Sequence, residues 1–170
     1  LAKIKKVVGL IKNSGRTGSI FFHSLLDGHP EILTTPGVYF KGFFSPEIWE
    51  KLYLGNDNKN WRQILVKNFL SFYSPFFDAK IIADVPGSPM TGPTGIASGL
   101  TTLGENKDIS LKLDASKFSK LLYTYLEGFD EMNRATFFKI IHLVYNSTIN
   151  RDITDSILFF HIHNPSYLET

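Results

Sequence analysis

The chain has 170 residues, 43% of them hydrophobic and 14% aromatic, which excludes a disordered chain and fits one domain with a packed core. Its formal net charge of +2 argues against a general nucleic-acid-binding surface, and the absence of cysteine excludes disulfides and thiolate chemistry. A chain without cysteine is typical of a reducing compartment, so we expect a cytoplasmic protein. No apolar run reaches the roughly 18 residues of a membrane span. Because the first residue is Leu1 rather than Met, a signal or anchor upstream stays open.

The first half of the chain begins with a predicted strand and a predicted helix. Residues 5–11, KKVVGLI, are short and β-branched and are bounded by glycine, which predicts a buried strand. A helix is expected from Thr17 or Ser19 to Leu26, ended by Asp27-Gly28 and Pro30. The other segments expected in this half are a second strand followed by a loop (31–44) and two helices (46–54 and 60–73).

The second half is expected to contain two strands, two helices and a loop. Residues 79–87, AKIIADVPG, predict a strand that ends in a turn, and the Pro- and Gly-rich residues 86–95 predict a loop. Apolar residues at helical spacing in 118–126 and 137–145 predict two core helices, and residues 155–167 predict a last strand. Alternating strands and helices predict a three-layer α/β domain with a mainly parallel sheet over residues 1–170.

The turn between the first strand and the first helix carries the strongest functional signal. Free backbone N–H groups at a helix start attract anions, and glycines permit the close backbone approach that this needs. An arginine there can form two hydrogen bonds to a phosphate or sulfate group. The residues expected to bind the anion are Ser14, Gly15, Arg16, Thr17, Gly18 and Ser19.

Two other interpretations of this turn were weighed. An ordinary strand-to-helix turn with an exposed arginine would have the same spacing. The P-loop of nucleotide triphosphatases does not fit, because Gly9 and Gly15 are separated by five residues and the basic residue is Arg16.

Residues 13–32, NSGRTGSIFFHSLLDGHPEI, resemble the start of sulfotransferases of the bacterial and carbohydrate type. The resemblance implies a P-loop-like α/β sandwich that binds 3′-phosphoadenosine 5′-phosphosulfate, the sulfuryl donor. It matches Arg16 to the basic residue of the family's loop, Thr17 to its small hydroxyl residue, and Ser19 to its first threonine. Ile20 stands where the family often has a second hydroxyl. The chain is shorter than a full sulfotransferase domain, so an incomplete domain is expected.

The last predicted strand is similar to the family's strand that ends at the 3′-phosphate site. Asn164 and Pro165 fit this pattern, but His163 stands where the family has arginine. A neutral imidazole has one donor and a guanidinium has five, so His163 would hold a 3′-phosphate weakly and with a pH dependence.

Sulfuryl transfer needs positioning and positive charge more than it needs a metal, and we expect no metal. Arg16 would stabilise the leaving phosphate, and the candidate bases for the acceptor hydroxyl are Asp84 and His161. Asp84 is equally explained as a turn former, and the pair His161 and His163 as polar caps at a strand end. His29 is interpreted as a cap for helix carbonyls, and His23 and His142 as helix residues without a special role.

Three functions stay open on this basis. The first is sulfuryl transfer to a small-molecule or glycan hydroxyl. The loop after Pro36 is expected to border this site, and core packing is expected for at least two of its four rings, Tyr39, Phe40, Phe43 and Phe44. The second is another P-loop-type nucleotide-binding enzyme, such as a small kinase. The third is a non-catalytic domain of the same fold. No nucleic-acid partner and no membrane segment within the chain are expected, and the acceptor and the oligomeric state are left open.

Overall fold

Two β-branched segments from opposite ends of the chain lie side by side and in parallel in the computed structural model. The model describes residues 3–11, 18–36, 40, 42–54, 59–81, 99–151 and 155–162. Strand β1 (Lys3–Ile11) pairs with β3 (Asp155–Ile162), and the short β2 (Ile32–Leu33) pairs in parallel with the other side of β3. The prediction of a mainly parallel sheet is confirmed. The described residues thus form an α/β fold with a small parallel sheet in the order β1-β3-β2.

The helices follow the segments with helical spacing. Asp114 caps α6 by accepting a hydrogen bond from the Lys117 N–H, and Asn133 caps α7 by accepting one from the Thr136 N–H. The described helices are α1 (Ser19–Leu26), α2 (Pro46–Leu52), α3 (Trp61–Phe72), α4 (Ser74–Phe77), α6 (Ala115–Leu126) and α7 (Arg134–Thr148). The predicted helices near 19–26, 46–54, 60–73, 118–126 and 137–145 are therefore confirmed.

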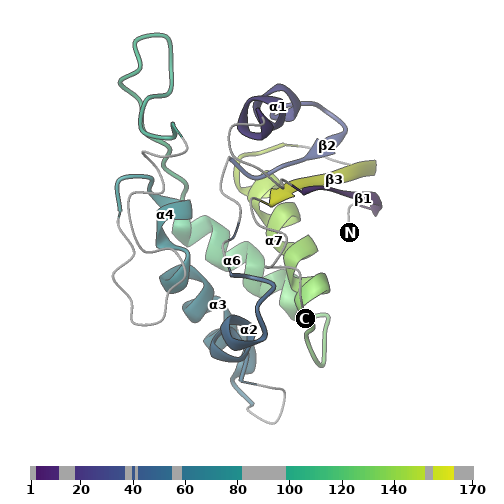
Figure 1. Ribbon diagram of the computed structural model, residues 1–170. Helices are drawn as coiled ribbons and strands as arrows, with labels where there is room; N and C mark the ends of the chain where they lie inside the picture. The colour runs from purple at the N-terminus through teal and green to yellow at the C-terminus, as the bar shows by residue number, and fades with distance from the viewer. Residues whose placement is uncertain are drawn as a thin grey trace.

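Helices α1 and α7 lie on opposite faces of the sheet, because successive residues of β3 point to opposite sides. The ring of Phe159 meets His23 of α1 edge to face at 5.5 Å. The ring of the next residue, Phe160, meets Phe138 of α7 at 5.1 Å. Phe160 also covers Gly9 of β1, where a side-chain Cβ would lie 2.9 Å from its ring. The remaining helices extend from the α7 side and form most of the core (Figure 1).

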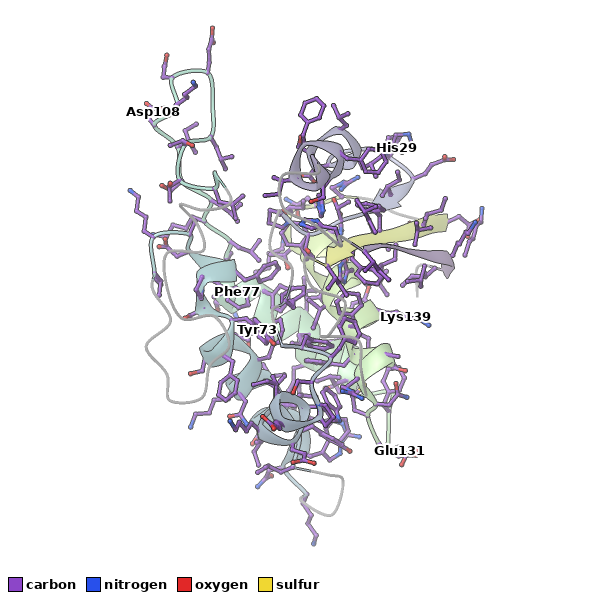
Figure 2. The ribbon with its side chains drawn as sticks, in the orientation of Figure 1. His29, Tyr73, Phe77, Asp108, Glu131 and Lys139 are labelled. Carbon is purple, nitrogen blue, oxygen red and sulfur yellow. The ribbon has the colours of Figure 1, made fainter. Side chains whose placement is uncertain are left out.

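Aromatic rings fill the space between the helices. Phe69 of α3 stacks on Phe118 of α6, and Phe43, which precedes α2, stacks on Phe137 of α7. All four side chains are completely buried. In Figure 2, Tyr73 and Phe77 lie among these side chains, and the exposed His29, Asp108, Glu131 and Lys139 lie at the periphery.

One predicted strand is wrong in its described part. Residues 79–81 form a turn, because the Asp78 carboxylate accepts a hydrogen bond from the Lys80 N–H and reverses the chain. Asp78 instead makes an isolated antiparallel bridge to Lys112. The second predicted strand exists, but it has only the two residues of β2.

Removing the central ring of this core should destabilise the fold strongly. We expect Phe69→Ala to lower the free energy of unfolding by about 3–5 kcal/mol, because a fully buried phenyl ring leaves a cavity. Phe21→Ala is the matched control: Phe21 is 68% exposed, and its loss should change stability by no more than about 0.5 kcal/mol. Urea unfolding followed by circular dichroism measures both. Equal effects of the two substitutions would contradict this account of the core.

Candidate functional site

The carboxyl ends of the three strands lie at one edge of the sheet. Ile11, the last residue of β1, is opposite Ile162, the last residue of β3. Strand β2 runs in the same direction and ends opposite Leu158, four residues before the end of β3. Helix α1 follows β1 along the chain and contacts the face of β3 that carries Phe159 and His161. In parallel α/β sheets, ligands bind outside this carboxyl edge. The polar groups of this edge are therefore the candidate site.

Helix α1 begins with a glycine and a buried serine. Gly18 has φ 72°, a left-handed conformation that favours glycine, and its carbonyl accepts the first helical hydrogen bond from Phe22 at 2.8 Å. Ser19 is 5% exposed, and its Oγ has no hydrogen-bond partner among the described residues. The first turn contains no acidic residue, so nothing in it opposes an anion.

One turn further along α1, a histidine pair links the helix to β3. The Nδ1 atoms of His23 and His161 are 2.7 Å apart, and the two rings meet edge to face with centroids 4.8 Å apart. The other ring nitrogen of His23, Nε2, lies 2.8 Å from the carbonyl oxygen of Thr35. His23 is 3% and His161 2% exposed. The arrangement connects α1, β3 and the chain after β2 in a single hydrogen-bonded chain.

The acceptor at the end of this chain determines where the protons are. A carbonyl oxygen can only accept, so His23 Nε2–H donates to Thr35. A neutral imidazole carries one ring proton, so His23 Nδ1 is an acceptor, and His161 Nδ1–H donates to it. His161 then has its lone pair on Nε2. The hydrogen bonds thus assign one tautomer to each ring.

Burial keeps the helix histidines neutral. Desolvation lowers the pKa of His23 from its ordinary value, and the Thr35 carbonyl and the Asp27 carboxylate offset this only in part. His142 of α7 is fully buried, and desolvation lowers its pKa to about 4, against the opposing effect of a hydrogen bond from its Nδ1–H to the Phe138 carbonyl. His23 lowers it further by charge repulsion.

Neighbouring hydrogen bonds hold the chain after β2 in place. The Thr34 hydroxyl donates to Asp27 Oδ1 at the end of α1 at 2.7 Å, and Asn146 Nδ2–H of α7 donates to the Thr34 carbonyl at 3.2 Å. Arg151 in turn donates from its guanidinium to Asn146 Oδ1 at 2.8 Å. The acceptor of the histidine chain, at Thr35, is therefore fixed by contacts to both α1 and α7.

Three of the site residues predicted from the sequence lie within the described part of the chain. Gly18 and Ser19 lie at the start of α1, and His161 lies in β3 against the same helix. The other predicted site residues lie outside the described residues: Ser14, Gly15, Arg16, Thr17, Asp84 and His163.

Two interpretations of histidines change with the structure. The sequence predicts that His29 caps helix carbonyls, but its Nδ1 accepts a hydrogen bond from the Glu31 N–H instead. The sequence indicates no special role for His23, whereas the structure makes it the partner of His161. The signal that could have identified His23 is its position four residues after Ser19, which puts both on one face of the helix. Phe40 and Phe43 are core residues, as expected for at least two of the four aromatic rings, and Phe44 is partly buried against the core.

The described residues were also compared with the requirements of a membrane span and of a metal site. No helix in the described ranges is long and apolar enough to cross a membrane. Within those ranges, no three His, Asp or Glu side chains are grouped so that they could hold a metal ion. Comparison of the chain with protein-family models, with curated proteins and with solved structures found no match.

Buried neutral histidines should make the fold sensitive to acid. Unfolded His142 takes up a proton below its ordinary pKa of 6.5, whereas folded His142 stays neutral down to about pH 4. The unfolded state thus binds more protons in this range, and stability should fall by about 3 kcal/mol as pH drops through it. The lowered pKa of His23 acts in the same direction.

Urea unfolding at a series of pH values measures this loss, and His142→Phe provides the comparison. Phenylalanine keeps the ring packing against Phe40 and Phe138 but has no proton to gain. Its stability should therefore fall less steeply with acid than that of the parent chain. Identical pH slopes for the two proteins would show that His142 is not the responsible group.

Proposed function

We propose that the chain is a sulfotransferase-type domain that binds 3′-phosphoadenosine 5′-phosphosulfate at the start of α1 and transfers its sulfuryl group to a hydroxyl acceptor. The proposal combines the resemblance of residues 13–32 to sulfotransferases with the position of this segment at the carboxyl edge of a parallel sheet. The finer fold that goes with it is a P-loop-like three-layer sandwich. The parallel strands, with α1 and α7 on opposite faces, support that assignment.

Ser19 is the observation that carries the proposal most strongly. A buried hydroxyl without a partner costs about 1–3 kcal/mol, so such groups usually have a function or an unseen ligand. Among the described residues Ser19 Oγ has no partner, and it lies at the first position of α1, where free N–H groups and the helix dipole favour an anion. A phosphate or sulfate oxygen at this place would accept the Ser19 hydrogen bond.

The remaining parts of the proposed site are assigned from the sequence. Arg16 and the backbone of residues 14–19 would hold the phosphosulfate and stabilise the negative charge on the leaving phosphate. His163 would face the 3′-phosphate. Asp84 or His161 would take the proton of the acceptor hydroxyl, which is a small molecule or a glycan. No metal is needed for this chemistry.

A non-catalytic domain with the same fold is the second candidate. Ile20 favours it, because this residue replaces a hydroxyl of the family's loop with an apolar side chain that is 39% exposed. The replacement of arginine by His163 points in the same direction. Binding of the donor product without any transfer would select this alternative.

Titration with 3′-phosphoadenosine 5′-phosphate tests the donor site without knowledge of the acceptor. Ser19→Ala should weaken binding by about 1 kcal/mol, the net contribution of one hydrogen bond, and Arg16→Ala by about 1.5–3 kcal/mol, that of a charge-assisted one. Calorimetry measures these differences.

Ser24→Ala is the matched control on the same helix. Its Oγ–H donates to the Phe21 carbonyl on the exposed side of α1, so its loss should leave affinity unchanged. A parent chain that does not bind the nucleotide would reject the donor site. If the Ser19 and Ser24 variants bind the nucleotide with equal affinity, the nucleotide does not bind at the start of α1.

A further inference from the structure

Strand β1 lies at the edge of the sheet although its sequence is typical of a buried strand. Among the described residues only β3 pairs with it, so its other side is the outer edge of the sheet (Figure 1). Its apolar run predicts burial, yet Val7 is 43% and Ile11 48% exposed. An exposed apolar edge presents a row of backbone N–H and C=O groups to which another strand can pair. The chemistry of this edge therefore calls for an extended strand as its partner.

The amino-terminal half of β1 is protected against such pairing. Lys5 and Lys6 are exposed, and the register with β3 shifts between Ile4 and Lys6, which marks a bulge. Edge lysines and bulges are the means by which natural sheets prevent a further strand from adding. Residues 7–11, VVGLI, have no charge and stay in regular register with β3. Only this second half of β1 is open to another strand.

The open segment is complementary to a second copy of itself. Its sequence is nearly symmetric about Gly9, with two aliphatic residues on each side. If two copies pair in antiparallel fashion about Gly9, Val7 lies opposite the partner's Ile11, and Val8 lies opposite the partner's Leu10. Because side chains alternate between the two faces of a strand, each face then has aliphatic side chains opposite aliphatic side chains.

The lysines select the antiparallel direction. Parallel pairing in register would put Lys5 and Lys6 opposite the same lysines of the other copy, and like charges directly opposite each other are destabilising. Antiparallel pairing about Gly9 leaves both lysines outside the five paired residues. In the sequence, the segment is bounded by Lys6 and Lys12, so lysines of both copies flank the pairing. Salt should therefore strengthen the association by screening this repulsion.

We propose that residues 7–11 of β1 are a dimerisation edge, at which a second copy of this chain pairs in antiparallel fashion about Gly9 and joins two sheets into one. A twofold axis at Gly9 gives the closed symmetry that is commonest among oligomers. Five residues provide roughly 17 Å of edge, which is small beside a standard interface of about 800 Å² per partner, so the dimer is weak and depends on concentration. The inference does not rest on the proposed function, because the carboxyl ends of the two β1 strands point away from each other.

Sedimentation velocity over a range of protein concentrations measures the association. Val7→Lys should raise the dissociation constant of the dimer at least about tenfold, because the new ammonium would have to lose water opposite an aliphatic side chain. Ile149→Lys is the matched control: Ile149 is 40% exposed and directly follows α7, so its replacement should leave the dimer unchanged. Urea unfolding establishes that both variants remain folded.

Disulfide cross-linking tests the register, because the chain contains no cysteine and an introduced thiol is the only one present. Val7 and the partner's Ile11 would have Cα atoms about 4.5–5.5 Å apart, within the range of about 4.4–6.8 Å that a disulfide spans. A mixture of the single variants Val7→Cys and Ile11→Cys should therefore form a covalent dimer in oxidised glutathione. Each variant alone should not, because the same position in the two copies would be roughly 13 Å apart.

The control for random collision is Leu54→Cys mixed with Ile11→Cys, since Leu54 is 59% exposed and lies outside β1. This mixture should not form a covalent dimer.

The contradicting results are distinct. A parent chain that stays monomeric at every concentration, with or without added salt, would reject a second copy as the partner of this edge. A dimer that Val7→Lys leaves intact would place the interface elsewhere on the molecule. Cross-linking of a single variant, or of the Leu54 mixture, as efficient as that of the Val7 and Ile11 mixture would overturn the pairing about Gly9.

Discussion

The attachment of α1 to the sheet depends on a buried polar contact as well as on aromatic packing against Phe159. The helix turns Ser19 and His23 toward β3, and it leaves Phe21 and Leu25 more than 60% exposed. Its main links to the sheet are the hydrogen bond of His23 to His161 and the edge contact of Phe22 with Phe159. A buried polar contact stabilises a fold only while every partner is satisfied, so the position of α1 depends on the protonation of two histidines.

This constraint connects the stability of the fold to the chemistry proposed for it. The histidine chain joins α1, whose first turn is the proposed anion site, to β3 and to the chain after β2. Ser19 is buried at the first turn, its Oγ has no partner within the described ranges, and the proposed anion would accept its hydrogen bond. The helix start, the Ser19 hydroxyl and the histidine pair therefore lie on one helix, α1, and the proposed phosphosulfate site would be built at its first turn.

Much of the fold could be predicted from the sequence because it follows from local patterns. The bounds of α1 follow from the glycines on either side of it, and the strand at residues 5–11 follows from its β-branched run. The turn at 79–81 could not be predicted, because the Asp78 side chain outweighs the strand preference of the isoleucines after it. The histidine pair was missed for a different reason. His23 and His161 are 138 residues apart, and only the register of β3 against α1 brings them together.

The protonation of the histidine pair is the central claim, and nitrogen-15 NMR of the imidazole rings observes it directly. In the neutral, ligand-free chain, the account predicts protonated Nε2 and bare Nδ1 for His23, and protonated Nδ1 and bare Nε2 for His161. Replacing His23 with leucine should free His161 to adopt either tautomer. A proton on Nε2 of His161 in the parent chain, or an unchanged spectrum of His161 in His23→Leu, would contradict the account.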